Sequence, residues 1–354
     1  MNSIDLSAMH KALALVRGGR LQDATACIQE SLADHEGGHP ARARDDLALN
    51  GPAASPRVCD AQDIVFKPLS PENEPSRVIE SEFPTKMGHL AYRLFVPERR
   101  ATLGLTPLVV MLHGCQQNAR DFAAGTQMDQ VAGKEGCFVV YPQQSNRANP
   151  AACWNWFKHT HQVREKGEPQ AIVDLVSYLV GTFKIDASRI YIAGLSAGGS
   201  MAAILGEQYP EVFSAVGVHS GLPSGMARNL PDALQAMQGR RSLASKTRLS
   251  LPTIIFHGDS DTTVSPVNGL HFSEALERDP KSRVEELTGT AGRSYTQRVY
   301  RTTEGALIGE FWSIQGAGHA WSGGSADGSY ADPIGPDASV EMMRFFLEST
   351  ESRK

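Results

Sequence analysis

The residue pattern with the clearest chemical meaning is Gly194-Leu195-Ser196-Ala197-Gly198, which matches G-x-S-x-G. A sharp turn between a strand and a helix needs small residues beside the serine, because Cβ atoms there would collide. The β-rich run 189–193 precedes the motif, and the small-residue run 198–203 continues it as a helix. Such a turn lifts the hydroxyl into a cleft. The sequence therefore predicts Ser196 as the nucleophile of an acyl transfer.

A serine hydroxyl is a weak nucleophile and needs a general base. After a nucleophile of this motif, an acid and then a histidine follow in chain order. His319 lies in the glycine-containing loop 316–321 after an apolar run, and we predict that it is the base. The acid that orients the imidazole is Asp261 or Asp259, both of which follow another apolar run. Asp259 is also suited to holding its own loop through an Asx-type turn.

The tetrahedral intermediate of acyl transfer needs backbone N–H donors for its oxyanion. The residue after the nucleophile, Ala197, supplies one donor. The second is expected from the loop 112–117 after an early strand, and we assign it to Cys115. His113 in this loop could pass for a catalytic base, but as part of an HG pair it is expected to brace the loop.

A long loop rich in aromatic residues covers 141–157, and loops of that length in compact domains are usually functional. Trp154 in this loop and Trp321 beside His319 are predicted to form an apolar platform for an acyl or polymer chain. The alternative is that both rings belong to the core. Gln116, next to Cys115, is also assigned to substrate binding.

Short apolar runs alternate with helical runs from about residue 85 onward. Strands are expected at 90–96, 107–112, 137–141, 189–193, 213–219, 252–256 and 311–314. Helices are expected at 122–132, 169–183 and 198–208, and a final helix through 347 is capped by Asp337. This order indicates an α/β fold with a mostly parallel sheet covered by helices on both faces. Ligands of such sheets bind beyond the carboxyl ends of the strands.

The chain divides into three predicted parts. Apolar residues at helical spacing, broken by Gly18-Gly19, predict a helical hairpin over 1–35. Residues 36–80 are rich in Gly, Pro, Ala and acidic residues and are expected to be a flexible linker. Residues 81–354 form the expected catalytic domain.

Composition excludes several classes of function. A net charge of −5 argues against nucleic acid as a partner. No apolar run reaches the ~18 residues of a transmembrane segment, and the first residues lack a secretory signal pattern, so a cytoplasmic location is expected. With five cysteines at least one stays unpaired within the chain. No metal-ligand spacing and no nucleotide-binding motif is present, so no metal and no cofactor is expected. The oligomeric state is left open.

Six segments in order resemble the polyhydroxybutyrate depolymerase-type esterases, which are related to feruloyl and acetylxylan esterases. They span about residues 85–349 and read PLVVMLHGCQQNARDFAAGTQMDQVA, FVVYPQQS, CWNWF, RIYIAGLSAGGSMAAIL, FHGDSDTTVSPVNG and GAGHAWSGG. The resemblance implies an α/β-hydrolase fold and gives the triad roles to Ser196, Asp261 and His319. It therefore favours Asp261 over Asp259.

The resemblance also implies a disulfide between Cys115 and Cys153. The expected activity is hydrolysis of carboxylic esters, with short-chain 3-hydroxybutyrate polymer or oligomers as substrate. The alternatives are a feruloyl or acetyl esterase acting on plant polysaccharide, and a granule-associated interaction protein docked through the first helices. Many members of this family are secreted, which makes an extracellular location the alternative to the cytoplasmic one.

Overall fold

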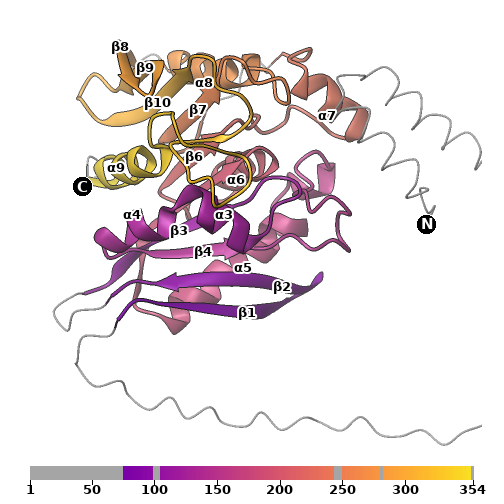
Figure 1. Cartoon of the computed structure of the whole chain (residues 1–354). Helices are drawn as coiled ribbons and strands as arrows, with labels where there is room; N and C mark the ends of the chain where they lie inside the picture. The colour runs from indigo at the N-terminus through magenta and orange to yellow at the C-terminus, as the bar shows by residue number, and fades with distance from the viewer. Residues whose placement is uncertain (1–74, 99–103, 243–248, 280–281, 352–354) are drawn as a thin grey trace, which may run out of the picture. The chain divides into compact units, whose positions relative to one another are not determined.

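The computed structural model describes residues 75–98, 104–242, 249–279 and 282–351 of the 354-residue chain (Figure 1). In these residues ten strands form one sheet in the order β1-β2-β4-β3-β5-β6-β7-β10-β9-β8. The predicted hairpin 1–35 and the linker up to residue 74 lie outside the described residues. No helix among the described residues is long and apolar enough to cross a membrane.

Parallel strands make up the middle of the sheet, and an antiparallel pair extends each edge. The parallel strands are β4 (Phe138–Pro142), β3 (Thr106–Leu112), β5 (Ile185–Leu195), β6 (Ala215–His219), β7 (Thr253–Gly258) and β10 (Leu307–Ile314). The edge pairs are β1 (Arg77–Thr85) with β2 (Gly88–Val96), and β9 (Arg293–Arg301) with β8 (Arg283–Ala291). Two short segments, β11 (Trp321–Ser322) and β12 (Ala331–Asp332), pair separately.

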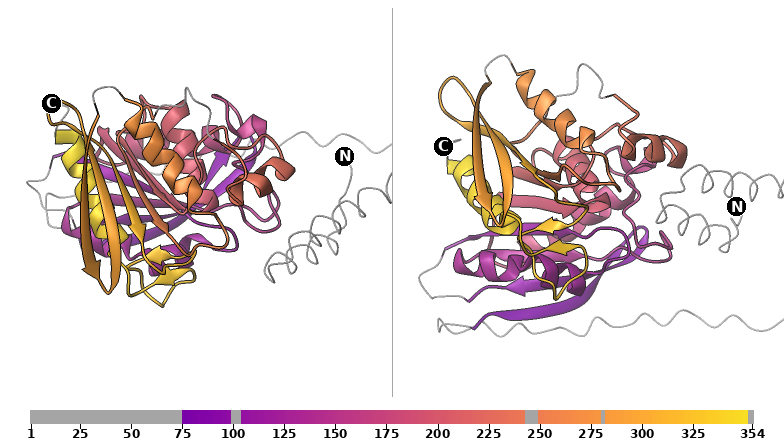
Figure 2. Two further views of the ribbon diagram at one scale, coloured as in Figure 1. Left: turned by 90° about the horizontal axis from the view of Figure 1, so that it is seen from above. Right: turned by 45° about the horizontal axis from the view of Figure 1, so that its top comes forward.

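Helices cover both faces of the sheet, with α9 and α8 on opposite sides of it (Figure 2). The helices packed on one face are α5 (Gly167–Thr182), α6 (Ala197–Gln208), α7 (Leu230–Met237) and α8 (Val267–Glu277). Those on the other face are α3 (Ala119–Thr126), α4 (Met128–Lys134) and α9 (Ala338–Glu351). A short 3-10 helix, η1 (His159–His161), precedes α5.

Strand β3 shows why continuous apolar runs become central strands. Leu108 and Val110 belong to the core cluster on one face, and Val109 and Met111 belong to the cluster on the other. All four side chains are fully buried. A strand buried on both faces needs apolar residues at every position, which removes the alternation typical of a half-exposed strand.

The predicted α/β-hydrolase architecture is confirmed, and each strand and helix expected within the catalytic domain has a counterpart among the described residues. Asp337 caps α9 as predicted, since its Oδ1 accepts the N–H of Val340 at 3.0 Å. The carboxyl ends of β3, β5, β6, β7 and β10 meet at one edge of the sheet. The loops that follow these strands carry the residues selected from the sequence.

Two local predictions are wrong, and two strands were missed. The linker was expected to reach residue 80, but β1 begins at Arg77. The helix expected at 122–132 is two helices, α3 and α4, because Gln127 between them adopts a left-handed conformation with φ 53°. Strands β8 and β9 were not predicted, because β8 is almost entirely exposed and β9 is mostly half-buried, so neither contains a continuous apolar run.

Candidate active site

Ser196 lies in the sharp turn between β5 and α6 that the sequence predicts. Its backbone has φ 57° and ψ −118°, a combination that residues with a Cβ rarely adopt. Its N–H donates to the carbonyl oxygen of His219 at 2.8 Å, which fixes the turn against the end of β6. The residue is 8% exposed, so Ser196 lies at a recessed place on the surface.

Close backbone packing explains the glycines around this serine. A Cβ on Gly198 would lie 2.0 Å from the carbonyl oxygen of Leu112, and a Cβ on Gly194 would lie 2.4 Å from the carbonyl carbon of Gly198. Side chains at either position would force the first turn of α6 away from the end of β3. The motif therefore brings Ser196 against the loop that follows β3.

His319 and Asp261 come together at the ends of β10 and β7. The two residues form a hydrogen bond of 2.7 Å between Nδ1 of His319 and Oδ2 of Asp261. The other carboxylate oxygen of Asp261 accepts the N–H groups of Thr263 and Val264, both at 2.9 Å. Because Nδ1 of His319 faces the carboxylate, Nε2 is the ring nitrogen left for a reacting group.

Burial by itself raises the pKa of the Asp261 carboxyl group. Hydrogen bonds from His257 and His319, together with their electrostatic attraction, outweigh this effect and hold the pKa well below its usual value. Asp261 is therefore charged at neutral pH. A buried carboxylate on Nδ1 is the arrangement that stabilises an imidazolium on the same histidine.

Asp259, the other candidate acid, does not contact His319. Its Oδ1 accepts the N–H of Gly316 at 2.7 Å and the hydroxyl of Ser260 at 2.9 Å. It therefore joins its own loop to the loop that carries His319. The expected Asx-type turn is replaced by this longer-range contact.

His113 braces the loop after β3, as the sequence indicates. Its Nδ1 donates to the carbonyl oxygen of Gly114 at 2.8 Å, and its Nε2 accepts the N–H of Gln144 at 3.0 Å. Only the neutral ring with its proton on Nδ1 makes both bonds. Burial lowers the pKa of His113 to about 4, despite the opposing effect of the bond to Gly114.

Two further buried histidines, His219 and His257, were not selected from the sequence. Nε2 of His219 accepts the N–H of Ser322 at 3.0 Å, while its carbonyl oxygen accepts the N–H of Ser196. This residue thus joins the serine turn to the loop of His319. Burial, with smaller effects from neighbouring histidines, lowers the pKa of His219 to about 3.

His257 stands behind Asp261. Its Nε2 lies 2.9 Å from the carbonyl oxygen of Val264 and 3.5 Å from Oδ2 of Asp261. The sequence did signal this group of histidines in one respect. Each of these histidines, His113, His219 and His257, occurs where an apolar strand run ends. A polar ring at that position contacts the loops at the carboxyl-end edge of the sheet, where the site lies.

The loop 113–118 is held at several points beside the serine turn. Cys115 forms a disulfide with Cys153, the pair implied by the family resemblance. The N–H of Gly114 donates to Oε1 of Gln117 at 2.9 Å. Among the described residues, neither the N–H of Cys115 nor that of Ala197 has a hydrogen-bond partner. A Cβ placed on Gly114 would lie 3.6 Å from the Cβ of Ser196, so this loop directly adjoins the serine.

The predicted tryptophan platform is wrong. Trp154 and Trp321 are each 1% exposed and pack in the two core clusters on opposite faces of the sheet. Nε1 of Trp321 donates to the hydroxyl of Ser339 at 3.1 Å, which fixes this ring inside the molecule. The alternative, that both rings belong to the core, is the one that the structure supports.

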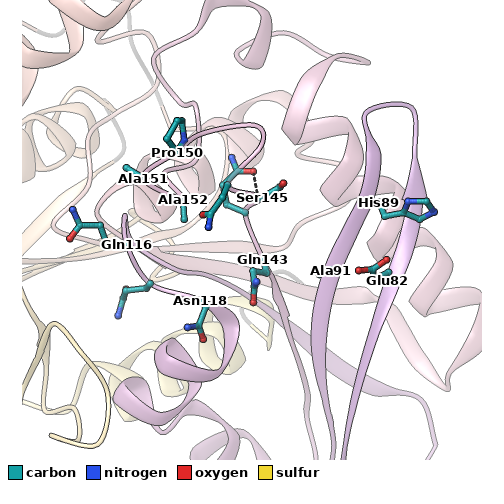
Figure 3. Close-up of a pocket in the computed structure, with 13 residues that line it drawn as sticks. Glu82, His89, Ala91, Gln116, Asn118, Gln143, Ser145, Pro150, Ala151 and Ala152 are labelled. Carbon is teal, nitrogen blue, oxygen red and sulfur yellow. Dashed lines mark hydrogen bonds between the residues drawn. The ribbon is translucent and has the colours of Figure 1, made fainter. Parts of the chain in front are cut away.

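Gln116 lines a cavity of about 590 Å³ on the outer side of the same loop (Figure 3). Its backbone adopts φ 66°, and its Oε1 accepts the hydroxyl of Tyr330 at 3.2 Å. Residues of the β1–β2 hairpin form the opposite wall. No cluster of three potential metal ligands occurs among the described residues.

Comparisons with known proteins agree on one group of enzymes. Residues 90–279 match the family model described as Esterase PHB depolymerase. Poly(3-hydroxyalkanoate) depolymerase C of Paucimonas lemoignei is 30% identical over 68% of this chain and 60% of its own length. Feruloyl esterase B of Thermothelomyces thermophilus is 29% identical over 68% of this chain and 86% of its own.

A solved structure supports the fold independently. The acetyl xylan esterase from Aspergillus awamori superposes with a TM-score of 0.58 at 17% identity, covering 77% of this chain and 99% of that one. The match to the first depolymerase covers less than two thirds of that protein. The activity of that depolymerase as a whole is therefore a property of a longer chain.

Proposed function

Since the chain belongs to the esterase PHB depolymerase family, we propose that it hydrolyses carboxylic esters through a covalent acyl-enzyme on Ser196. The observation that carries the proposal is the 2.7 Å bond between Asp261 and His319, in a loop that His219 joins to the turn of the strained, recessed Ser196. The order of these residues along the chain, serine, acid, histidine, is that of the α/β-hydrolases.

In the proposed reaction, Oγ of Ser196 attacks the ester carbonyl carbon while Nε2 of His319 takes the hydroxyl proton. The charge of Asp261 stabilises the imidazolium without accepting its proton. The N–H groups of Cys115 and Ala197 donate to the oxyanion of the tetrahedral intermediate. The carbon–oxygen bond to the alcohol then breaks, and His319 returns the proton to the alcohol. In the second half, His319 activates a water molecule, which releases the acid and restores Ser196.

The proposed substrates are short-chain 3-hydroxyalkanoate esters, either polymer or oligomers. The similarity to a poly(3-hydroxyalkanoate) depolymerase supports this choice. The cavity next to Gln116 also supports it, because no Phe, Tyr or Trp lines this cavity to hold a feruloyl ring. The similarity to feruloyl esterase B keeps an aryl or acetyl ester as the second candidate.

The test is hydrolysis of p-nitrophenyl acetate and butyrate by the wild type and by Ser196→Ala. We expect the variant to lose several orders of magnitude in kcat. Ser260→Ala is the control, because Ser260 is exposed and its hydroxyl donates to Asp259, away from His319; it should stay within twofold of the wild type. A fluorophosphonate should also add its mass to the peptide that contains Ser196. Equal rates in wild type and Ser196→Ala would reject Ser196 as the nucleophile.

A second panel separates the candidate substrates. Trimers of 3-hydroxybutyrate are compared with methyl ferulate and acetylated xylan oligosaccharides at equal concentration. A preference for the trimer by kcat/KM supports the 3-hydroxyalkanoate assignment, and a preference for either of the others supports the plant-polysaccharide reading.

The proposal also covers the cellular compartment of the protein and the role of residues 1–74. The Cys115–Cys153 disulfide favours an oxidising compartment, since such bonds are rare in the cytosol. This supports the extracellular alternative over the predicted cytoplasmic location. Docking through residues 1–74 is tested by deleting them: unchanged turnover with lost granule association would support an interaction role for that segment.

A further inference from the structure

Glu168 is a buried carboxylate that takes no part in the reaction proposed above. Three carboxylates are buried among the described residues, namely Asp261, Glu310 and Glu168. Asp261 orients the proposed base, and Glu310 pairs with the guanidinium of Arg344 at 2.7 Å. Glu168 lies in the first turn of α5 and has no lysine or arginine partner within the described part of the chain. A buried carboxylate without such a partner needs several hydrogen bonds to replace the water it loses.

Hydrogen bonds from the loop 144–155 supply this replacement. Oε1 of Glu168 accepts the side-chain N–H groups of Gln144 at 2.6 Å and of Asn155 at 2.5 Å. Oε2 accepts the backbone N–H of Asn155 at 2.7 Å and lies 3.3 Å from Nδ1 of His161. Burial by itself raises the pKa of the Glu168 carboxyl group, but the contacts with His161 and Asn155 outweigh this effect and hold the pKa below its usual value. An ionised carboxylate, which only accepts hydrogen bonds, therefore joins the two ends of the loop.

The loop 144–155 contacts the loop 113–118 at three points around the proposed oxyanion donor. The contacting pairs are Gln144 with His113, Cys153 with Cys115, and Ala151 with Gln116. The first pair forms a hydrogen bond of 3.0 Å, the second the disulfide, and the third a hydrogen bond of 2.8 Å. The proposed donor, the N–H of Cys115, belongs to the middle pair. Its position therefore depends on the position of the loop 144–155.

Two residues at this contact have a strained backbone. Gln116 has φ 66° and Ala152 has φ 50°, in the left-handed region that residues with a Cβ rarely adopt. Such conformations persist only where the surrounding contacts hold them. Oδ1 of Asn155 accepts the side-chain N–H of Asn149 at 3.2 Å, and Oδ1 of Asn149 accepts the N–H of Ala151 at 3.0 Å. The carboxylate that fixes Asn155 therefore also supports the strained pair.

We propose that Glu168 is a positioning residue, which holds the loop 144–155 so that the N–H of Cys115 points at the oxyanion of the tetrahedral intermediate. The inference rests on the proposed esterase function. Among the described residues, Glu168 contacts neither His319 nor the loop 113–118 itself. Loss of its bonds should therefore weaken the stabilisation of the oxyanion and leave the general base unchanged.

The main variant is Glu168→Gln, which keeps the shape of the side chain. Its NH₂ group must face at least one N–H that the carboxylate accepts, so one end of the loop 144–155 is released. The second variant, Gln144→Met, keeps the length and the backbone N–H of Gln144 and removes its side-chain bonds, including the one to Glu168. Glu310→Gln is the matched control, because Glu310 is also buried and its partners lie on β9, β10 and α9, away from both loops.

Four measurements separate a positioning role from a purely structural one. Rates with p-nitrophenyl butyrate are divided by the number of serines that a fluorophosphonate labels at completion, so unfolded protein does not contribute. The Ki of a trifluoromethyl ketone, whose hemiketal with Ser196 carries an oxyanion, reports on the donor. Hydrogen exchange of the peptide 113–118, followed by mass spectrometry, reports on the loop without turnover. Urea unfolding gives the stability of each variant.

We expect kcat of Glu168→Gln to fall by about 10- to 100-fold, with KM within about threefold and Ki for the ketone raised by a factor similar to the loss of kcat. Gln144→Met should lose about three- to tenfold in kcat. The midpoint of the pH profile of kcat/KM should stay where it is in the wild type. Exchange should rise in 113–118 and not in 257–264. Glu310→Gln should lose stability and keep kcat within about twofold.

A kcat per labelled serine within about twofold of the wild type in both Glu168→Gln and Gln144→Met would overturn the proposal. An equal loss of kcat in Glu310→Gln would also overturn it, because burial alone would then explain the effect of Glu168. If the wild type hydrolyses no ester, the proposed function fails. Hydrogen exchange still decides the link in that case, since unchanged exchange of 113–118 in Glu168→Gln would show that Glu168 does not hold this loop.

Discussion

Two regions at the carboxyl ends of the strands surround Ser196, and different kinds of contact hold them. The donor loop, residues 113–118, is held by hydrogen bonds of two uncharged side chains, His113 and Gln117, and by a covalent bridge through Cys115. One bond of Gln117 goes to the carboxylate of Asp121, on the outer helix α3. The base loops, residues 257–264 and 314–323, are held around the charged side chain of Asp261 and its bond to His319.

The difference follows from what each region must do in the proposed reaction. Backbone N–H donors need only a fixed position, which neutral contacts and a disulfide supply. A general base acquires positive charge during the reaction, and a nearby carboxylate stabilises that charge. The donor loop should therefore be sensitive to reductant, and the base loops should be sensitive to the loss of one charge.

The largest expected effect is on the base loops. Asp261→Asn removes the charge and turns an N–H towards Nδ1 of His319, which favours the wrong tautomer of the ring. We expect kcat for p-nitrophenyl butyrate to fall by about 10³–10⁴.

Asp259→Asn is the control on the same loop, since Asp259 bonds to Gly316 and Ser260 and not to His319. Its kcat should fall by less than about tenfold. A larger loss of kcat in Asp259→Asn than in Asp261→Asn would identify Asp259 as the acid. The pair of Asp261 and His319 would then not be what distinguishes the base loops from the donor loop.

The next effect is on the donor loop. Replacing both Cys115 and Cys153 by serine opens a bridge across 38 residues and should cost about 3–4 kcal/mol of unfolding free energy in the chain-entropy model. The N–H of Cys115 also loses its fixed position, so we expect kcat to fall by about 10- to 100-fold. Urea unfolding and steady-state rates measure the two losses.

Treatment of the wild type with dithiothreitol should reproduce both losses. Cys137→Ala is the control, because Cys137 is a buried cysteine outside the bridge. This variant should keep the full response to reductant. A double-serine variant with wild-type kcat would mean that the disulfide does not position the donor.

The sequence predicted the candidate site residues that are recognisable from their residue type and their position after a strand. The glycines around Ser196 signal the turn because the backbone approaches within distances that exclude a Cβ. His319 and Asp261 follow apolar runs, and parallel strands bring such positions to one edge. The disulfide came from the family resemblance, since spacing alone does not specify pairing.

Other features depend on contacts between distant segments, which a pattern along one chain does not contain. Trp154 and Trp321 are apolar whether they line a cleft or a core, so their burial could not be inferred from their type. Strands β1 and β8 are mostly exposed at the two edges of the sheet and lack an apolar run. The cavity exists only because the β1–β2 hairpin lies against the loop 143–152.

The smallest expected effect concerns both regions, because a buried histidine with a lowered pKa lies in the first region and another contacts the second. His113 belongs to the donor loop, with a pKa of about 4, and His219 supports the base loops, with a pKa of about 3. An unfolded histidine titrates near 6.5. Between about pH 6.5 and 4 the unfolded state therefore binds protons that the folded state does not. The stabilisation from both residues is complete above pH 6.5 and is lost as the pH falls through this window.

We expect the urea unfolding free energy to be lower at pH 4.5 than at pH 7.5, by about 2 kcal/mol for each of these histidines. His113→Gln cannot titrate, so its loss between the two pH values should be about 2 kcal/mol smaller, even if the variant is less stable at both. His89→Gln is the control, since His89 is exposed, and should leave the pH difference unchanged. An unchanged pH difference in His113→Gln would mean that the ring is not held neutral. The donor loop would then depend on charge as the base loops do, and the contrast between the two regions would disappear.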